Sequence, residues 1–184
     1  MAAALEGSGK PFVITAHRNG EASDNVAIAL AERGVRTAIV SLAPSVHGPA
    51  DRHGFVPRLI GIAREKGVSA YVGDGSNRWP AVHQLDAASL FRLALETAPA
   101  GSQFRGVGDE GVPFREIAEV IGRHLNLPVA SISREEADAH FGWLGALASR
   151  DLPRSSVETQ ELLGWRPVHP GLIADLEQGH YFNR

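Results

Sequence analysis

The sequence lacks cysteine altogether, and only Lys10 and Lys66 among its 18 basic residues are lysines. The absence of cysteine excludes disulfides, a thiol nucleophile, and thiolate ligation of zinc or an iron–sulfur cluster. The formal net charge of −3 provides no positive excess that would attract nucleic acid or an anionic membrane. No apolar run approaches the ~20 residues that a membrane span needs, and no signal-peptide core follows Met1, so we expect a cytoplasmic protein.

The composition that remains is typical of a globular protein. The chain has 184 residues, enough for one domain of ordinary size or for most of a larger one. Apolar residues make up 43% of it and charged residues 21%, a balance that supports a packed core and argues against disorder.

The first strong pattern is a strand–helix–strand unit. The apolar run 11–15 predicts a buried strand. Ser23 or Asp24 is placed to cap a helix, and Gly34 stands where that helix stops. The β-branched run 35–41 predicts a second strand. This spacing indicates a βαβ unit with a parallel strand pair, and therefore the α/β class.

Helical patterns dominate the rest of the chain. Helices are predicted over 55–66, 86–96 and 114–125, with capping boxes at 133–136 and 155–158 and short strands at 69–72 and 104–107. Parallel strands are normally buried on both faces in sheets of several strands, so two strong strands make a poor core by themselves. The sequence therefore resembles the later part of a larger α/β protein.

One glycine pattern matches a dinucleotide fingerprint by spacing alone. Gly106, Gly108 and Gly111 form a G-x-G-x-x-G after a predicted strand and before a predicted helix. Asp109 lies between the glycines, where it would repel a pyrophosphate, and Pro113 removes an N–H from the helix start. We interpret the segment as a plain turn.

Other catalytic patterns are also weak. Gly7–Lys10 resembles the end of a phosphate loop, but no strand precedes it. His47, His53 and His83 come nearest to a metal set, yet none has the i, i+4 spacing of two ligands on one helix face, and we predict no metal site. We predict instead that His83 holds the turn before a helix capped by Asp86. No G-x-S-x-G nucleophile elbow is present.

A dense group of polar-tipped and aromatic side chains follows the turn at Asp74 and Gly75. It contains Arg78, Trp79 and His83. One interpretation is a turn with Trp79 packed into the core. The other is the wall of a pocket, with Arg78 offering its planar fork to a phosphate or carboxylate.

Four segments in order carry a resemblance to a known family. They are VSLAPSVHG at 40–48, VGDGSNRWPAVHQLD at 72–86, FREIA at 114–118 and LGWRP at 163–167. The second segment is similar to a G-D-G-x-x-R-x-x-x-V-H-x-x-D pattern, and the last to L-G-W-x-P. Both patterns are typical of the NAD-dependent epimerase/dehydratase family of the extended short-chain dehydrogenase/reductase superfamily, and the resemblance covers that family's later part.

The resemblance implies an α/β fold with two parts. Residues 1–48 and 79–98 would form a partial NAD(P)-binding Rossmann-like fold made of the later strands. Residues 49–78 and 99–184 would form a mostly helical substrate-binding part.

The resemblance also implies positions for ligands. NAD or NADP would be the cofactor, with Pro44, Ser45 and Val46 on its nicotinamide side. The substrate would lie near His47, Arg78 and Trp79.

The departures from the family concern its catalytic residues. Ala16 and His17 stand where the family has a Ser or Thr, and Gly20 and Asp24 where it has Tyr and Lys. A tyrosine acid/base with a lysine that lowers its pKa is needed for the family chemistry. The glycine fingerprint has no counterpart either, so we name no catalytic residue.

Several functions therefore remain open. The first is an NAD(P)-dependent oxidoreductase or epimerase acting on a small carbonyl or sugar-like substrate, in a truncated chain or in an atypical branch without the Tyr/Lys pair. The alternative is a non-catalytic small-molecule binding module or an interaction fragment. In that case the strand edges at Val13 and Ile39 would pair with another chain or form a homodimer.

Overall fold

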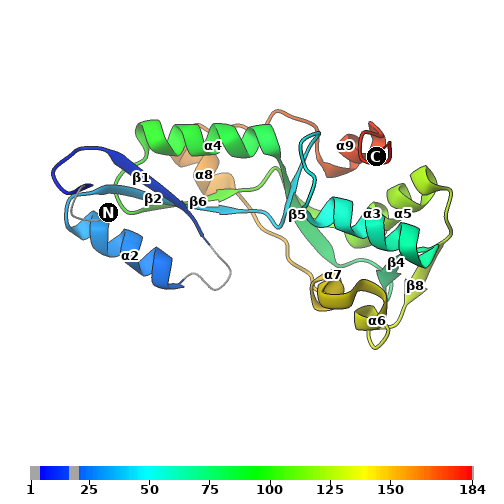
Figure 1. The fold of residues 1–184 in the computed structure, drawn as a ribbon. Coiled ribbons are helices and arrows are strands. Elements are labelled where there is room, and N and C mark those ends of the chain that lie inside the picture. Colours follow the sequence, from blue (N-terminus) through cyan, green and yellow to red (C-terminus); the bar gives the residue numbers. More distant parts are fainter. Residues whose placement is uncertain (1–4, 17–20, 184) are drawn as a thin grey trace.

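The computed structural model describes residues 5–16 and 21–183, arranged as two lobes along one long axis (Figure 1). The predicted positions His17 and Gly20 lie outside the described residues, as does the side chain of Ser23. Among the described residues, no helix is both long and apolar enough to cross a lipid bilayer.

The first lobe is a three-stranded parallel sheet in the order β1-β2-β6. Its elements are β1 (Pro11–Thr15), α2 (Glu21–Glu32), β2 (Arg36–Leu42), α4 (Gln84–Thr97), β6 (Ser102–Gly106) and α8 (Val157–Leu163). Figure 1 shows α2 and α4 on opposite sides of this sheet. The register pairs Phe12 with Thr37 and Thr15 with Val40, which confirms the predicted parallel βαβ unit.

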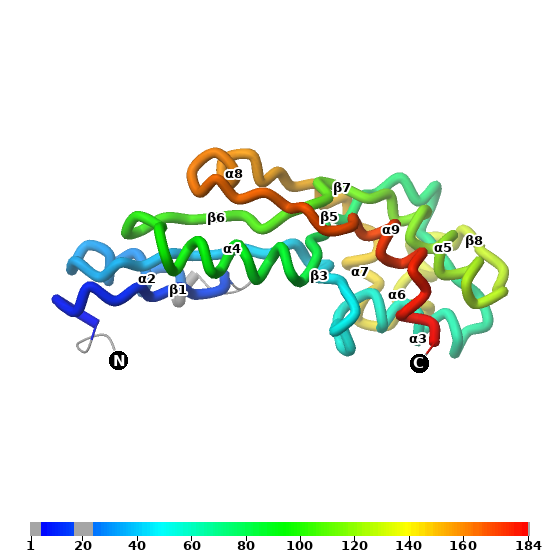
Figure 2. Tube along the Cα trace, turned by 90° about the horizontal axis from the view of Figure 1, so that it is seen from above, coloured from blue at the N-terminus to red at the C-terminus, as the bar shows by residue number. Residues whose placement is uncertain are grey.

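The second lobe combines a three-stranded sheet, a two-stranded sheet and most of the helices. The sheet orders are β3-β5-β7 and β4-β8. The strands are β3 (Ser45–His47), β4 (Ser69–Val72), β5 (Arg78–His83), β7 (Asp109–Pro113) and β8 (Val129–Ile132). The helices are α3 (Phe55–Lys66), α5 (Phe114–Leu125), α6 (Ala137–Phe141), η1 (Gly142–Leu144), α7 (Gly145–Ala148) and α9 (Leu172–Glu177). Figure 2 shows that β5 lies where the lobes meet.

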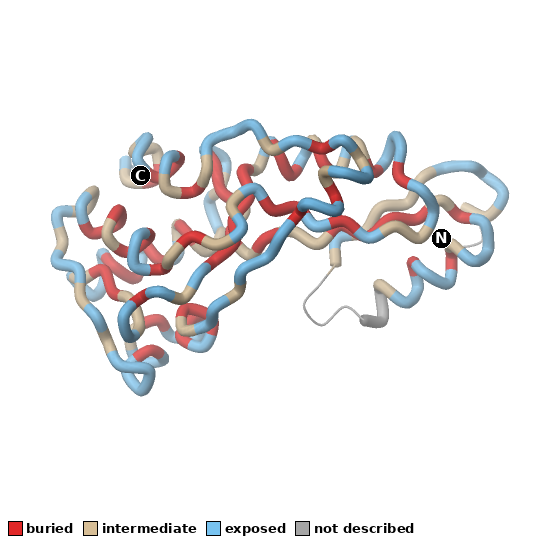
Figure 3. Tube along the Cα trace, turned by 180° about the vertical axis from the view of Figure 1, so that it is seen from behind, coloured by how far each residue is buried: buried red, intermediate tan, exposed pale blue. Residues whose placement is uncertain are grey.

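Two hydrophobic cores hold the lobes. The core of the first lobe includes Val40, Leu90, Phe104 and Trp165. The larger core of the second lobe includes Ile60, Trp79, Phe114, Ile117, Leu144 and Leu172. Strand β5 contributes to both, because Ala81 belongs to the larger core and Val82 to the smaller. Figure 3 shows buried segments in both lobes, in agreement with one core in each.

Some predicted helix ends agree with the structure and others differ. Helix α2 begins at Glu21, so the predicted cap at Ser23 or Asp24 is wrong. The predicted capping box at 155–158 is also wrong, because Ser156 is at the cap position of α8 and makes no side-chain cap hydrogen bond.

Helix α3 ends at Gly67, which adopts the left-handed conformation with φ 69°. The Ser133–Glu136 capping box forms, with both reciprocal hydrogen bonds present. The prediction that Asp86 caps α4 is wrong. The cap is His83, which accepts the Leu85 N–H, so His83 does hold the turn as predicted.

The G-x-G-x-x-G segment is partly a strand and not a plain turn. Gly106 ends β6, and Asp109–Pro113 is β7, paired antiparallel with β5. The Asp109 carboxylate accepts the backbone N–H of Leu172 at the start of α9 at 2.7 Å. A carboxylate therefore occupies this turn and leaves no cradle for a pyrophosphate.

Candidate functional site

A cavity of about 480 Å³ opens at the carboxyl ends of β1 and β2, between the two lobes. Its lining comes from both lobes: Ala16, Asp24, Ser41, Leu42, Pro44, Phe55, Leu147, Arg150, Leu152 and Arg154. In open parallel α/β sheets, ligands bind in the crevice outside the carboxyl ends of the strands. This position makes the cavity, called the cleft below, the candidate binding site.

Arg150 and Arg154 supply the positive charge of the cleft. They are four residues apart in one extended segment, with Leu152 midway between them. All three residues line the cleft. Backbone hydrogen bonds of 2.9 Å hold this segment, from Leu152 N–H to Arg78 O and from Arg154 N–H to Glu110 O. Neither guanidinium has an ion-pair partner among the described residues, so both are free to bind an anion.

The other polar side chains of the cleft are the carboxylate of Asp24, in the first turn of α2, and the hydroxyl of Ser41, near the end of β2. Asp24 and Ser41 line the cleft and also a neighbouring cavity of about 300 Å³ against α8, so the two cavities meet here. One oxygen of Asp24, Oδ1, is buried without a hydrogen-bond partner. A buried acceptor of this kind is costly unless it is paired. This oxygen can accept a hydrogen bond from a hydroxyl or amide group of a bound molecule.

Aromatic side chains line the wall formed by the second lobe. Phe55 faces the cleft, and its ring centroid lies 5.6 Å from that of Trp79 and 6.0 Å from that of Trp143. Trp143 is 68% exposed, whereas Trp79 is 1% exposed. The exposed indole therefore lies beside a residue of the cleft wall.

The residues predicted to contact the cofactor are separated by the structure. Pro44 lines the cleft. Ser45 is buried in β3, where its hydroxyl has no hydrogen-bond partner, and Val46 is half-buried in the same strand. Of the three predicted cofactor contacts, Pro44 therefore lies in the cleft, whereas Ser45 and Val46 lie in β3 at the junction of the lobes.

The residues predicted to contact substrate are dispersed as well. Arg78 forms a bidentate ion pair with Asp151, at 3.0 and 2.8 Å, which raises the pKa of Arg78 and lowers that of Asp151. Trp79 packs in the larger core, and its Nε1–H donates to Leu147 O at 3.2 Å, as the core interpretation expected. His47 is fully buried. Of the three, only Arg78 presents a functional group to solvent.

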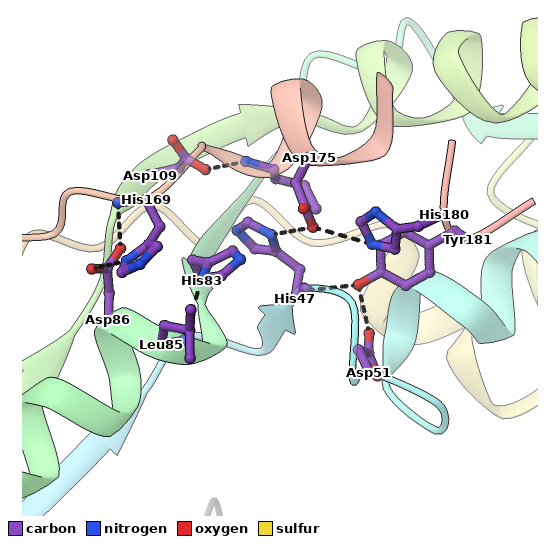
Figure 4. Close-up of polar contacts among 12 residues, drawn as sticks. His47, Asp51, His83, Leu85, Asp86, Asp109, His169, Asp175, His180 and Tyr181 are labelled. Carbon is purple, nitrogen blue, oxygen red and sulfur yellow. Dashed lines mark hydrogen bonds and ion pairs between the residues drawn. The ribbon is translucent and has the colours of Figure 1, made fainter. Parts of the chain in front are cut away.

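His47 belongs to a buried network of histidines and carboxylates at the lobe junction (Figure 4). Its Nδ1 donates to Asp175 Oδ2 at 2.9 Å, and its ring meets that of His83 edge-on with centroids 5.4 Å apart. His83 stacks on His169 at 4.8 Å. Burial, together with the neighbouring His47, lowers the pKa of His83 and so favours its neutral ring.

Three members of this network satisfy the simplest test for a metal site. One ligand atom each from His83, Asp86 and His169 lies within 4.8 Å of the others. The two imidazole planes are only 11° from parallel, so their in-plane lone pairs do not converge on one ion. The Asp86 carboxylate is also occupied, because it accepts two backbone N–H groups and the His169 ring. This chemistry fits a structural clamp better than a metal centre.

The structure also tests whether the described residues could hold a dinucleotide. Pro44 is available on the nicotinamide side predicted from the family resemblance. For the pyrophosphate, the G-x-G-x-x-G pattern is excluded by β7 and by the Asp109 carboxylate. Within residues 5–16 and 21–183, no other segment of this pattern exists. Of the residues predicted to contact the cofactor, only Pro44 lines the cleft, and the described residues provide no glycine cradle for a pyrophosphate.

The two arginines of the cleft were not predicted from the sequence. Arg150, Leu152 and Arg154 lie between two short helical patterns, in a stretch where proline interrupts any periodicity. The alternation of arginine with leucine was the available signal. Asp24 was named as a helix cap and as the residue at the family's lysine position, and neither interpretation placed it in a binding site.

Comparison with known proteins gives relatives and structural neighbours. No family model matches the chain. An uncharacterized protein of Schizosaccharomyces pombe is 54% identical over 152 residues, which are 83% of this chain and 51% of that protein. The uncharacterized protein YLL056C of Saccharomyces cerevisiae is 42% identical over 207 residues, covering 100% of this chain and 68% of that protein. The chain thus spans between half and about two thirds of the length of these relatives.

Solved structures add the fold. The dTDP-glucose 4,6-dehydratase DesIV of Streptomyces venezuelae, with NAD and TYD bound, has a TM-score of 0.63 at 21% identity over 88% of this chain and 48% of its own. MoeE5 in complex with UDP-glucose and NAD has a TM-score of 0.72 at 18% identity, over 99% of this chain and 68% of its own. At these identities the likeness establishes the fold alone. The chain belongs to the same family as the yeast protein YLL056C, and its fold is that of the NAD-dependent epimerases and dehydratases.

Proposed function

We propose that this chain binds a small carbonyl or sugar-like substrate in the cleft, as part of an NAD(P)-dependent oxidoreductase or epimerase. The observation that carries the proposal is the pair of unpartnered arginines in a cavity at the carboxyl ends of parallel strands. The arginines bind an anionic group of the substrate, while Asp24 and Ser41 hydrogen-bond its neutral polar groups. These roles are binding and orientation, and no described residue is assigned as the proton donor.

A nicotinamide cofactor, NAD or NADP, is part of this proposal. Neighbours of the same fold are crystallised with NAD or NADPH, which supports it. When bound, such a cofactor supplies or accepts a hydride. The first test is calorimetric titration of the folded chain with NADH and with NADPH. Binding tighter than about 100 μM, roughly 5.5 kcal/mol, would support a cofactor site in this chain.

The alternative is a binding module without catalysis, and one assay separates the two functions. A panel of small aldehydes and ketones is incubated with the chain and NADH or NADPH, and the nicotinamide absorbance is followed. An oxidoreductase consumes the reduced cofactor in the presence of at least one carbonyl compound. Saturable ligand binding in the cleft with no change in absorbance would favour the non-catalytic module.

A second candidate function is pairing with another strand through β1. Strand β1 is the outermost strand of its sheet, and within the described residues it pairs only with β2. The opposite edge is covered, because Thr159 of α8 accepts the Arg105 N–H at 2.7 Å. The predicted edge at Ile39 is wrong, since β2 is the central strand.

An open edge strand presents unpaired N–H and C=O groups to another chain. We propose that β1 pairs with a second copy or with a strand of a partner. Light scattering across a range of concentrations, with hydrogen exchange of residues 11–15, tests the homodimer. We expect a mass increase together with slower exchange of these amides, and a monomer at every concentration would refute the homodimer.

A further inference from the structure

The chemistry of the cleft lining indicates what kind of molecule it selects. Among the residues that the structure describes, four polar side chains line it: Asp24, Ser41, Arg150 and Arg154. Sugar hydroxyls need a hydrogen-bond partner each, and a polar ligand group left unpaired in a pocket costs affinity. When the two arginines bind an anionic group, Asp24 and Ser41 are the described polar side chains that remain for a ring with several hydroxyls.

Apolar side chains make up the rest of the lining, and they come from separate elements. They are Ala16, Leu42, Pro44, Phe55, Leu147 and Leu152. Phe55 is continued outward by the exposed ring of Trp143. Such a wall gains free energy by covering an aromatic or aliphatic body, roughly in proportion to the apolar area removed from water.

The charges are divided between the two sides of the cleft. Arg150 and Arg154 belong to the extended segment before α8, and Leu152 projects between them. An extended chain rises about 3.3 Å per residue, so the Cα atoms of the two arginines are about 13 Å apart. The apolar side chain of Leu152 lies between them. The Asp24 carboxylate, in the first turn of α2, disfavours a second anion beside Ser41 at the end of β2.

We propose that the cleft selects a ligand with an aromatic or aliphatic body that carries one carboxylate or phosphate. The anionic group lies at the arginine side, and the apolar body covers Leu152 and Phe55. A neutral carbonyl of the ligand accepts a hydrogen bond from the Ser41 hydroxyl, or a hydroxyl of the ligand donates one to Asp24. This inference rests on the proposed function, because it names the substrate class of the same cleft. The cleft should therefore bind an apolar acid more tightly than a sugar phosphate.

The probe for this inference is 4-oxo-4-phenylbutanoate, which has an aromatic ring, a ketone and one carboxylate. Calorimetric titration compares it with its methyl ester, which lacks the charge, and with glucose 1-phosphate, which has the charge on a polar body. We expect the acid to bind at least tenfold more tightly than either comparison compound.

Variants locate the binding. Arg150→Gln and Arg154→Gln are conservative changes at exposed positions. At least one of them should lower the affinity for the acid tenfold or more. Leu152→Asn should lower this affinity as well, because it replaces the apolar side chain between the two arginines with a polar one. Arg92→Gln on α4, which pairs only with Glu96 at the surface, is the matched control and should leave the affinity unchanged. Circular dichroism of each variant verifies folding.

The possible results separate the two proposals. Tighter binding of glucose 1-phosphate than of the acid would overturn the inference and leave the proposed function standing. Equal binding of the acid and its ester would also overturn it, because the arginines would then contribute nothing. Failure of all three probes to bind the folded chain would count against both proposals. A loss of affinity in Arg92→Gln equal to that in the cleft variants would place binding outside the cleft and overturn the inference.

Discussion

The Nδ1 atom of His47 lies 2.9 Å from Oδ2 of Asp175, although 128 positions separate the two residues. His47 is the last residue of β3, and Asp175 belongs to α9 near the end of the chain. Both side chains are at most 1% exposed. Asp175 is also 3.8 Å from His180, and Tyr181 reaches back to the Gly48 N–H at 2.9 Å. The C-terminal segment is therefore fastened to the junction of the lobes by buried polar contacts.

Removing the carboxylate of this pair should destabilise the fold. Asp175→Ala leaves the His47 Nδ1–H buried without its acceptor, and we expect a loss of about 3 kcal/mol in the free energy of unfolding. Asp175→Asn keeps an oxygen acceptor and should lose only about 1 kcal/mol. Urea denaturation followed by circular dichroism measures both. Equal losses in the two variants would contradict a role for the hydrogen bond.

The histidine network also predicts a dependence of stability on pH. The folded pKa of His83 is below its ordinary value of 6.5, mainly through burial and then through His47, with His169 acting in the same direction. Asp175 and Asp86 oppose this shift. As the pH falls below 6.5, the unfolded chain takes up a proton that the folded chain resists. The free energy of unfolding should therefore decrease with falling pH until the folded pKa is passed.

The control for this prediction is His83→Asn. Asparagine is a good helix cap and can still accept the Leu85 N–H, but it does not titrate. His140, whose pKa is also lowered by burial, contributes to the same pH window in both proteins. Urea midpoints at pH 7.5 and at pH 5.5 should therefore differ less in the variant than in the original chain. An unchanged difference would show that His83 does not contribute.

Local patterns were sufficient to predict the elements of the first lobe. The apolar run 11–15 and the β-branched run 35–41 became the paired parallel strands, because both periodicity and residue type agree there. Helix 114–125 was equally clear, since its apolar residues recur on one face. In contrast, β5 contains Pro80 and two aromatic rings, and its partner β7 reads as a glycine turn. Their pairing depends on tertiary contacts that no local pattern encodes.

The same reason explains what was missed at the candidate site. The cleft is formed by residues from positions 16 to 154, and no two of its charged residues from different lobes are neighbours in sequence. Arg78 was singled out because it lies in a recognisable motif, but its guanidinium group is already paired with the Asp151 carboxylate. Arg150 and Arg154 carry no motif and became candidates only through their position at the strand ends. Sequence patterns identify residues in motifs, whereas the residues of this site are set by which distant segments meet at the carboxyl ends of the strands.

Trp79 should contribute far more to stability than the exposed Trp143. Trp79→Ala removes a fully packed indole and its hydrogen bond to Leu147 O, so we expect a loss of about 4 kcal/mol in the free energy of unfolding. Trp143 is 68% exposed, and Trp143→Ala should cost about 0.5 kcal/mol or less. Denaturant unfolding of both variants is the measurement. Comparable losses would be inconsistent with the packing described for the larger core.

Two glycines of the Val72–Ser76 turn provide a matched pair for testing its geometry. Gly73 and Gly75 both have positive φ, 63° and 70°, so alanine at either position should cost about 1 kcal/mol in backbone strain. A Cβ at Gly73 would meet nothing within 4 Å, whereas at Gly75 it would lie 2.5 Å from Arg115 Cβ and 2.7 Å from Tyr71 Cδ2.

The additional clash should raise the cost of Gly75→Ala by about 1–3 kcal/mol over that of Gly73→Ala. Gly75 O also accepts the Arg115 N–H in the first turn of α5, so displacement of this turn would disturb the start of that helix. Thermal unfolding of the two variants side by side measures the difference. If the variants unfold at the same temperature, the turn does not pack against Tyr71 and Arg115 as closely as these distances require.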